Sequence, residues 1–287
     1  MKRKVKIVIK RWIEGGLAIF LILLLSQPTY IIYFDHSPEE YIKWIERLSS
    51  FYSNYPSLDD YYSSLEKDSS FYRLVLNQLK DKEKNYFLQM RPFISKIAKA
   101  SQKTGVPTHS IASHIKRESQ FDPWAVSNKG AYGLMGITIW AYQDIYRLRS
   151  RTKWVAEALE EYGDFSWEEV QFDPELNIVV GTAYYKFLLN QFKDTTLASL
   201  AYNWGMGNVY LMQERYGDKE GIFARLEDLA STRSEWVEPF EYPEHISNFK
   251  AVFQKVEERI KFAYATYKEI HLDSFASLES PEKNPSS

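Results

Sequence analysis

The stretch that decides the fold runs from residue 111 to residue 137 and reads IASHIKRESQFDPWAVSNKGAYGLMGI. Its first part carries apolar side chains at helical spacing, and the helix is predicted to stop before Pro123. Three glycines, Gly130, Gly133 and Gly136, then predict a loop whose backbone can run close to a ligand. The stretch therefore predicts a helix that leads into a loop suited to binding.

Glu118 falls in the last turn of this predicted helix. A carboxylate there is opposed by the negative end of the helix dipole, and half-burial by Phe121 and Trp124 would also favour its neutral form. A neutral carboxyl is the general acid that a glycosidic oxygen needs. By position alone, a solvated helix-end residue near Lys116 and Arg117 is the favoured interpretation, so the case for this chemistry depends on the surrounding motifs.

Helical patterns recur along the chain after residue 36, and no convincing strand alternation appears. The predicted fold class is all-α. The patterns predict helices around residues 38–48, 57–67, 69–80, 93–104, 108–119, 153–162, 177–192, 197–202 and 249–267.

Composition excludes several classes of site. The chain has 287 residues and no cysteine, which rules out disulfides, thiolate metal sites and a cysteine nucleophile. Its five histidines are scattered, so neither a metal nor a cofactor is expected. Beyond residue 11 the chain carries 30 basic and 38 acidic residues, which argues against nucleic-acid binding. Aromatic residues make up 16% of the chain and suit either a core or a sugar-binding surface.

The N-terminus has the pattern of a secretory signal or a membrane anchor. Residues 1–11 hold six basic side chains and no acid, and the mainly apolar segment 17–34 follows. No A-x-A-like cleavage site is present, so an uncleaved anchor is favoured. The positive-inside rule places the rest of the chain beyond the inner membrane, in the periplasm. Residues 1–35 are therefore predicted to be an anchor or signal, 36–91 a helical spacer, and 273–287 a disordered tail.

Another stretch, LAYNWGMGNV at residues 200–209, places an aromatic and an amide side chain before a Gly-x-Gly turn. By itself it fits a sugar-binding wall or a helix end with a packed tyrosine. The order and spacing of all the motifs, however, resemble the lytic transglycosylases with a soluble-lytic-transglycosylase (SLT-type) domain. The matching motifs are Glu118-Ser119, Ser127, Gly133-Leu134-Met135, the run from Pro174 to Gly181, and the run from Ala201 to Gly207.

The resemblance implies a lysozyme-like catalytic domain over residues 92–272. It implies cleavage of the β-1,4 bond between N-acetylmuramic acid and N-acetylglucosamine in peptidoglycan glycan strands, without water, to leave a 1,6-anhydro end. Glu118 would be the single acid/base, assisted by the N-acetyl group of the substrate. Substrate-binding residues would be Ser119, Ser127, Gly133, Met135, Tyr202, Asn203 and Glu244.

The sequence also departs from the family pattern. The family glutamine falls at Gly136, and a family methionine falls at Thr138. The family motif Glu-Thr-x-x-Tyr-Val is matched only in part, with Glu244 standing for its glutamate and Asn248 replacing its tyrosine. Residues 149–173 look like an insertion that would cover the site or contact a partner, such as a protein of an envelope complex.

Two other functions remain open from the sequence. One is a hydrolytic muramidase resembling goose-type lysozymes, with Asp122, Asp144 or Asp173 holding the attacking water. The other is a non-catalytic glycan-binding or assembly protein, which the loss of the family glutamine at Gly136 would favour. His114 lies on the same helix face as Glu118 and is expected to be a packed or solvated residue rather than a ligand.

Overall fold

The computed structural model describes residues 8–9, 19–23, 30–34, 65 and 68–276. The chain divides into two compact units, Met1–Pro56 and Ser57–Ser287. The named elements in the described part of the second unit are all helices, which confirms the predicted class for that unit. Its helices are α3 (Ser69–Gln78), α4 (Asp81–Met90), η1 (Arg91–Phe93), α5 (Ile94–Thr104), α6 (Thr108–Ser119), α7 (Ile139–Arg149), α8 (Lys153–Leu159), η2 (Glu160–Tyr162), α9 (Trp167–Phe172), α10 (Pro174–Phe192), α11 (Thr195–Trp204), α12 (Met206–Tyr216), α13 (Lys219–Thr232), η3 (Ser234–Trp236) and α14 (Val237–Ala276).

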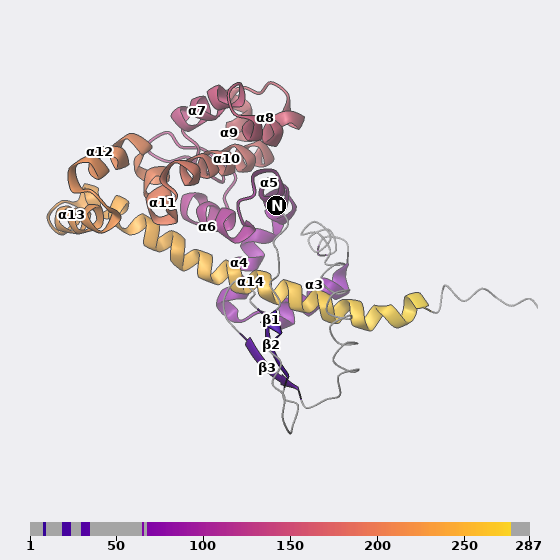
Figure 1. Ribbon diagram of the computed structural model, residues 1–287. Helices are drawn as coiled ribbons and strands as arrows, with labels where there is room; N and C mark the ends of the chain where they lie inside the picture. Colours follow the sequence, from indigo (N-terminus) through magenta and orange to yellow (C-terminus); the bar gives the residue numbers. More distant parts are fainter. Residues whose placement is uncertain (1–7, 10–18, 24–29, 35–64, 66–67, 277–287) are drawn as a thin grey trace, which may run out of the picture. The chain divides into compact units, whose positions relative to one another are not determined.

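Helix α10 forms the centre of the unit (Figure 1). It is apolar on nearly all sides and packs against α5, α7, α9 and α11, as a helix enclosed by others must. Its start is fixed by Asp173, whose carboxylate accepts hydrogen bonds from the amides of Glu175 (2.8 Å) and Leu176 (3.1 Å). Pro174 occupies the first turn, where no amide hydrogen is needed. This central helix holds the loop described below.

Helix α14 begins earlier than the sequence predicts. The expected last helix starts at Phe249, whereas α14 starts at Val237 and continues through Pro243. Proline removes one hydrogen bond from a helix interior, and packing of this segment against α6 and α11 offsets the loss. Buried Tyr242 and Ile246 lie on that packed side.

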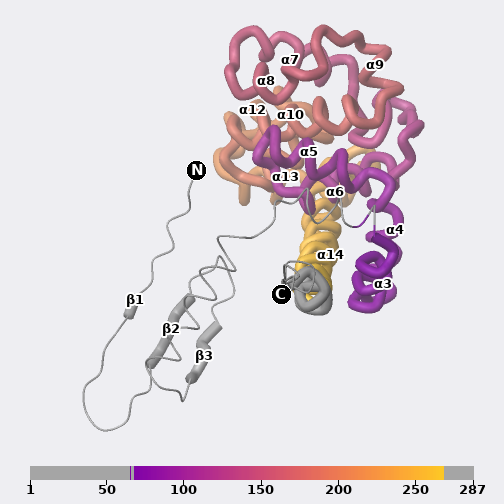
Figure 2. The backbone as a smooth tube through the Cα atoms, turned by 90° about the vertical axis from the view of Figure 1, so that its right-hand side faces the viewer, coloured from indigo at the N-terminus to yellow at the C-terminus, as the bar shows by residue number. Residues whose placement is uncertain are grey.

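The far half of α14 packs against α3 and α4 (Figure 2). Phe71 of α3 lies 5.4 Å from the rings of both Tyr264 and Tyr267 of α14. The Tyr267 hydroxyl donates to Asp68, which also caps α3. The helix predicted over residues 69–80 is thus confirmed as α3, and in the structure it is part of the compact second unit. The helices expected before residue 65 lie outside the described residues.

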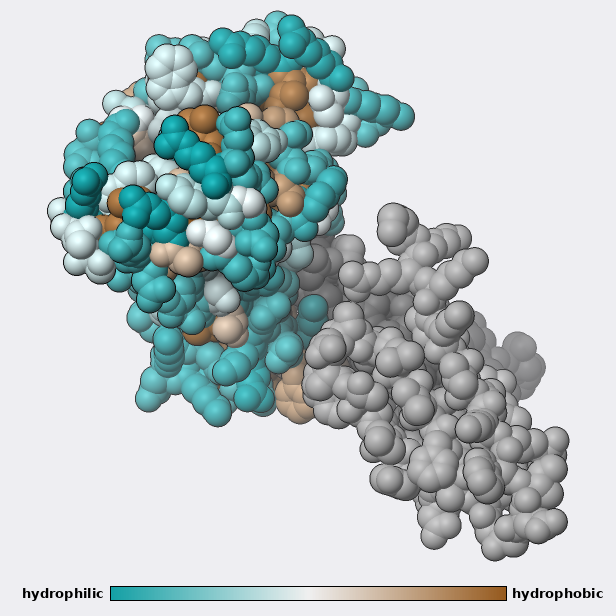
Figure 3. All heavy atoms as spheres, turned by 60° about the vertical axis from the view of Figure 1, so that its left-hand side comes forward, coloured by the Kyte–Doolittle hydropathy of each residue, from teal (hydrophilic) through white to brown (hydrophobic). Residues whose placement is uncertain are grey.

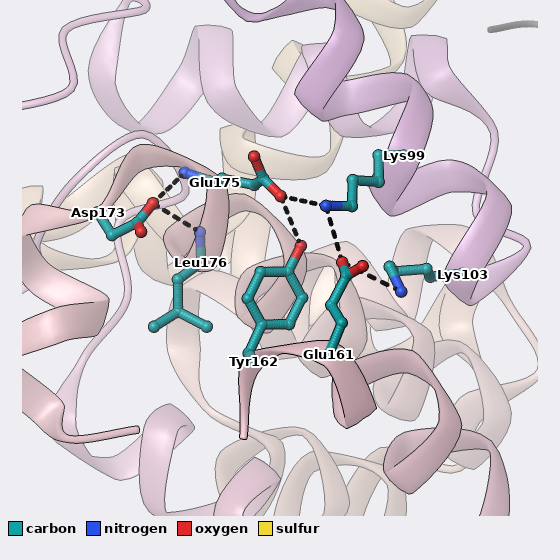
Figure 4. A network of polar contacts seen from close by, with 7 residues as sticks. All are labelled: Lys99, Lys103, Glu161, Tyr162, Asp173, Glu175 and Leu176. Atoms are coloured by element: carbon teal, nitrogen blue, oxygen red, sulfur yellow. Dashed lines mark hydrogen bonds and ion pairs between the residues drawn. The ribbon is translucent and has the colours of Figure 1, made fainter. Parts of the chain in front are cut away.

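The segment 149–173 forms α8, η2 and α9, as predicted for its helix near residues 153–162. A polar network ties it to the body (Figure 4). The Lys99 ammonium lies 2.8 Å from Glu161 and 2.5 Å from Glu175, while Lys103 lies 3.2 Å from Glu161. The Tyr162 hydroxyl donates to Glu175 at 3.0 Å. Hydrogen bonds from Lys99, the largest favourable influence, hold the pKa of Glu161 at about 2.

Lys99→Ala is expected to lower the free energy of unfolding by about 1 kcal/mol, because one partly exposed ammonium pairs with two carboxylates. Amide hydrogen exchange should increase in α8 and η2. The matched control is Lys153→Ala, which removes an exposed pair with Glu157 at 3.6 Å and should change stability by less than about 0.5 kcal/mol. Equal effects of the two substitutions in urea unfolding would contradict this role for the network.

The first unit contains three short strands, β1 (Val8–Ile9), β2 (Ile19–Leu23) and β3 (Tyr30–Phe34). They form an antiparallel sheet in the order β1-β2-β3. No strand was predicted here, because a short apolar run cannot be assigned to helix or strand by periodicity. Both longer runs are rich in isoleucine and aromatic residues, which favour strands. The rest of the predicted anchor lies outside the described residues.

Within the described residues, no helix combines the length and the apolar character that crossing a bilayer requires. The visible surface of the helical unit is mostly hydrophilic, with separate hydrophobic residues between polar ones (Figure 3). Large exposed hydrophobic side chains include Trp124, Val126 and Trp140, which come from the segments on either side of the glycine-rich loop.

Candidate active site

Glu118 lies in the last turn of α6 and is half-buried. Its Oε1 atom accepts a hydrogen bond of 2.5 Å from the Tyr242 hydroxyl of α14. Among the described residues it forms no ion pair within 4.0 Å. Desolvation by burial is the largest influence on the pKa of Glu118 and raises it from 4.5 to about 7, although the Tyr242 hydrogen bond acts in the opposite direction. Glu118 is therefore a carboxyl that can hold or release a proton near neutral pH.

The end of α6 has an unusual backbone. Gln120 (φ 55°) and Phe121 (φ 67°) both adopt left-handed conformations that residues other than glycine seldom adopt. Ser119 supports this turn, because its hydroxyl donates to Ile115 O (3.0 Å) and accepts from Phe121 N (3.2 Å). Strained backbone beside a candidate functional residue is typical of functional sites. The Ser119 side chain is buried against its own helix, so the structure gives it a role in ending α6.

The loop after α6 folds back on itself as a small ribbon. Val126 pairs with Tyr132, and Tyr132 pairs with Ile137. The Ser127 hydroxyl accepts hydrogen bonds from the amides of Lys129 (3.2 Å) and Ala131 (3.0 Å), which closes the tip of the loop. The loop is thus a compact structure with its own hydrogen bonds, and the glycine-rich segment lies in its return half.

Asn177 of α10 fixes this ribbon to the core. Its side chain is 1% exposed. The amide oxygen accepts from Met135 N (2.8 Å), and the amide nitrogen donates to Tyr132 O (3.0 Å) and Val170 O (2.9 Å). A β-carbon on Gly133 would lie 2.7 Å from Asn177 Cγ, so only glycine permits this close approach. Asn177 lies in the matching run from Pro174 to Gly181, but no role was predicted for it.

Tyr202 joins the same loop to α11. Its hydroxyl donates to Met135 O at 2.7 Å. Burial raises the pKa of Tyr202 well above its usual value, and the charge of Glu118 adds to the rise. The Met135 side chain is 1% exposed and contacts the position of Gly181, so in this structure the backbone of Met135, and not its thioether, faces Tyr202.

His114 packs against two tyrosines, Tyr185 and Tyr202. Its ring centroid is 4.1 Å from that of Tyr185 and 5.0 Å from that of Tyr202. Nδ1 bonds to Ser110 O at 2.9 Å, and since a carbonyl only accepts, Nδ1 carries the hydrogen. Desolvation lowers the pKa of His114 to about 4, so the ring is neutral at pH 7. Of the two roles left open by the sequence, packed or solvated, this geometry shows the packed one.

Four segments meet at Glu238 on the exposed side of the site. Its carboxylate lies 3.4 Å from Arg117 and 3.4 Å from Lys129, and it accepts a hydrogen bond from Asn203 Nδ2 at 3.3 Å. These exposed pairs are individually weak. Together they bring the sequence-predicted Asn203 and the tip of the loop toward the first turn of α14.

Glu238 and Tyr242 are the site residues that the sequence analysis missed. They are four residues apart, the spacing of glutamate and tyrosine in the family motif Glu-Thr-x-x-Tyr-Val. Pro239 and Pro243 stand where that motif has threonine and valine, which hid the match. Glu244, the residue assigned to that glutamate from the sequence, is exposed on α14. A substrate-binding role for Glu244 stays a prediction. From α14, Tyr242 donates to Glu118, and Glu238 contacts Arg117, Lys129 and Asn203.

Within the described part of the chain, no three histidine, cysteine, aspartate or glutamate residues are grouped so that they could hold a metal ion. The site brings together the Glu118 carboxyl of raised pKa, the buried phenol of Tyr242 and the partly buried phenol of Tyr202.

Part of the chain is similar to a known family of domains. Residues 95–222 match the family model described as "Transglycosylase SLT domain". Residues 95–222 are thus similar to the SLT domain, which confirms the resemblance that the motifs indicated. The matched residues include α6, the loop, α10 and α11, but not α14.

Curated relatives match over the same part of the chain. The membrane-bound lytic murein transglycosylase C of Serratia proteamaculans (strain 568) is 34% identical over 146 residues, covering 48% of this chain and 36% of that protein. The protein of the same name from Sodalis glossinidius is also 34% identical with the same coverage, and that from Pectobacterium atrosepticum is 32% identical. The match thus spans little more than a third of the length of these relatives.

Two solved structures are similar at lower identity. The 70 kDa soluble lytic transglycosylase SLT70 of Escherichia coli has a TM-score of 0.45 and 19% identity, covering 63% of this chain and 30% of that one. An inactive mutant of the lytic transglycosylase Slt of Pseudomonas aeruginosa has a TM-score of 0.35 and 22% identity, covering 60% and 25%.

Proposed function

We propose that this protein is a peptidoglycan lytic transglycosylase that cleaves the β-1,4 bond between N-acetylmuramic acid and N-acetylglucosamine and leaves 1,6-anhydro ends. The single observation that carries the proposal is the half-buried carboxyl of Glu118, with a pKa of about 7, inside a segment that matches the SLT domain. A carboxyl protonated near neutral pH is suited to general acid catalysis.

In the proposed reaction Glu118 donates its proton to the glycosidic oxygen as the bond from that oxygen to C1 of the muramic sugar breaks. The carboxylate then takes the proton of the C6 hydroxyl of the same sugar, whose oxygen bonds to C1. Glu118 ends the cycle protonated, and no water is consumed. The N-acetyl group of the substrate would stabilise the cationic C1, since this chemistry uses no second carboxylate nucleophile.

Around this reaction Ser127, Tyr202 and Asn203 would contact the sugars, with the backbone of Gly133 and Met135 beside them. These roles, and those of Ser119 and Glu244, remain proposals. Tyr202 is supported by its closeness to the charge of Glu118, and Asn203 by its contact with Glu238.

Hydrolysis by a muramidase mechanism is the alternative. It requires a second acid to hold water, and the three aspartates considered from the sequence are engaged elsewhere. Asp122 accepts from Trp124 N (2.9 Å), Asp173 caps α10, and Asp144 lies 3.8 Å from Arg147. Glu238 is the acid whose charge acts on Glu118, and it is paired with Arg117 and Lys129.

Digestion of purified peptidoglycan with the full-length protein, followed by mass spectrometry of the muropeptides, tests the proposal. Anhydro-muropeptides are expected. Reducing ends in the abundance expected of the anhydro ends would establish hydrolysis instead. Intact glycan strands that sediment with the protein would indicate a binding protein.

Tyr242→Phe is expected to raise the pKa of Glu118 further, because the hydrogen bond that it removes favours the charged carboxylate. Wild-type activity should be lost as the pH rises through about 7, since the acid must start protonated. In the variant this alkaline limb should move to higher pH, while the maximal rate falls about tenfold because the carboxyl is less well held.

The pH dependence of product release measures both effects. Tyr210→Phe is the matched control, because Tyr210 is an exposed tyrosine of α12 whose hydroxyl lies 3.3 Å from Gln191. An alkaline limb that stays in place in Tyr242→Phe would rule out direct control of Glu118 by this hydroxyl.

We further propose that the protein works in the cell envelope. The curated relatives are named membrane-bound murein transglycosylases, and the basic N-terminus with its apolar segment fits an anchor or a signal. The inner-membrane anchor with a periplasmic catalytic domain, the envelope-complex partner and the division at residues 35, 91 and 272 all stay proposals. Membrane fractionation of cells that produce the full chain tests the anchor.

A further inference from the structure

Gly136 occupies the position of the family glutamine, and it lies directly against the Glu118 carboxyl. A β-carbon on Gly136 would be 2.5 Å from Glu118 Oε2, 3.0 Å from its Cβ and 3.1 Å from its Cδ. Non-bonded carbon atoms pack at about 3.5–4.0 Å. The Glu118 carboxyl in this position therefore leaves no space for any side chain at residue 136.

The backbone at Gly136 cannot easily move away, because both neighbours are fixed. Met135 N donates to Asn177 and Met135 O accepts from Tyr202. Ile137 N and O both pair with Tyr132 at 2.9 Å. Gly136 itself has a φ of 57°, and its amide donates to Gly133 O at 3.1 Å. The clash made by a side chain at this position would consequently be relieved by movement of Glu118.

The two carboxyl oxygens have different surroundings. Oε1 accepts the hydrogen bond from Tyr242, and Oε2 fills the space next to the Gly136 α-carbon. In a protonated carboxyl the carbonyl oxygen is a stronger acceptor than the hydroxyl oxygen. With Tyr242 donating to Oε1, the hydrogen is therefore assigned to Oε2, the oxygen beside Gly136.

We propose that Gly136 is a positioning residue whose missing side chain provides the space for Glu118 Oε2 and so holds the proton-donating oxygen in its half-buried position. This inference rests on the proposed function for its catalytic meaning, but the placement of the carboxyl is a claim about the folded protein alone. It also predicts that restoring the family glutamine damages this chain.

Gly136→Ala tests the placement, and Gly105→Ala is the matched control. Both glycines have left-handed backbones, so both alanines carry a similar backbone cost. A β-carbon on Gly105, however, would have nothing within 4 Å. Each substitution is made in the full-length wild type and in a Glu118→Ala background, and the urea midpoints of unfolding are compared.

We expect Gly136→Ala to lower the midpoint strongly in the wild type and much less in the Glu118→Ala background, where the clashing carboxyl is absent. Gly105→Ala should lower it equally in both. If Gly136→Ala alone does not fold, the double variant should fold. Equal effects of Gly136→Ala in the two backgrounds would overturn the inference.

Titration of the Glu118 carboxyl by ¹³C NMR, assigned by its loss in Glu118→Gln, separates this inference from the proposed function. The pKa is expected near 7 in the wild type and lower in Gly136→Ala, since the carboxyl is pushed toward solvent. An unchanged titration in a folded Gly136→Ala protein would refute the placement, whatever the activity.

The activity assay then tests the catalytic part. Both Gly136→Ala and Gly136→Gln should cleave peptidoglycan at least tenfold more slowly than the wild type, with the alkaline limb of Gly136→Ala at lower pH. The cleavage rate of Gly105→Ala should lie within about twofold of the wild-type rate. A wild type that cleaves nothing would reject the proposed function while the titration and the unfolding cycle still decide the position of the carboxyl. Faster cleavage by Gly136→Gln would reject the positioning role.

Discussion

Glu118→Gln is expected to reduce peptidoglycan cleavage by about 10³-fold or more while the protein remains folded. The amide keeps the shape of the side chain but cannot give a proton to the glycosidic oxygen or reclaim one, and general acid–base groups commonly contribute about 10²–10⁴-fold. Anhydro-muropeptide release, followed over time by mass spectrometry, measures the loss. Glu214→Gln, at an exposed glutamate of α12, is the control and should retain full activity.

The same substitution has a stability signature with a defined sign. Glu118 has a folded pKa of about 7 against an ordinary value of 4.5, so the folded state retains its proton when the unfolded state has lost it. Wild-type stability therefore decreases as the pH rises from about 4.5 to 7, by up to roughly 1.4 kcal/mol for each unit of pKa difference. Glu118→Gln removes this dependence, so the stability of the variant relative to the wild type should be higher at pH 8 than at pH 4.

A variant that cleaves within tenfold of the wild type would exclude Glu118 as the acid/base. If Glu118→Gln were inactive but also destabilised at pH 8, loss of folding rather than loss of the proton would explain the result. Measuring urea unfolding at both pH values distinguishes the two explanations.

Asn177→Ala is expected to lower the free energy of unfolding by about 3 kcal/mol, the largest stability effect in the site. It leaves Met135 N and Val170 O without this partner in a buried position, while Tyr132 O keeps its hydrogen bond from Ile137 N. Each unsatisfied buried group costs on the order of 1–3 kcal/mol, and relaxation of the loop recovers part of this. Cleavage should also fall by about 10²-fold, because the released loop carries Gly136 away from Glu118.

Equilibrium unfolding in urea measures the stability change. Asn208→Ala is the matched control, since the Asn208 amide makes one exposed hydrogen bond of 2.7 Å to Trp204 O. It should change stability by less than about 0.5 kcal/mol. A similar small change in Asn177→Ala would show that Asn177 does not fix the loop to α10.

Most helices of the second unit were predictable because their signals are local. Asp173 and Pro174 start α10, and Gly105 ends α5 in a left-handed conformation. The start of α14 was not predictable, because Pro239 and Pro243 are typical of a helix boundary. Packing against α6 and α11 decides that α14 continues through Pro243. For β2 and β3 the composition favoured strands, whereas the periodicity could not distinguish a strand from a helix.

The sequence by itself determined that Glu118 stands at a helix end before a glycine-rich loop, and the order of its motifs indicated the SLT family. Those features depend on neighbouring residues and on spacing along one chain. Only the tertiary structure decided that Tyr242, 124 residues away, donates to Glu118, and that Gly136 leaves space for the other carboxyl oxygen. The physical reason is that the raised pKa of Glu118 comes mainly from burial, and burial is produced by α14, the loop and α6 packing together.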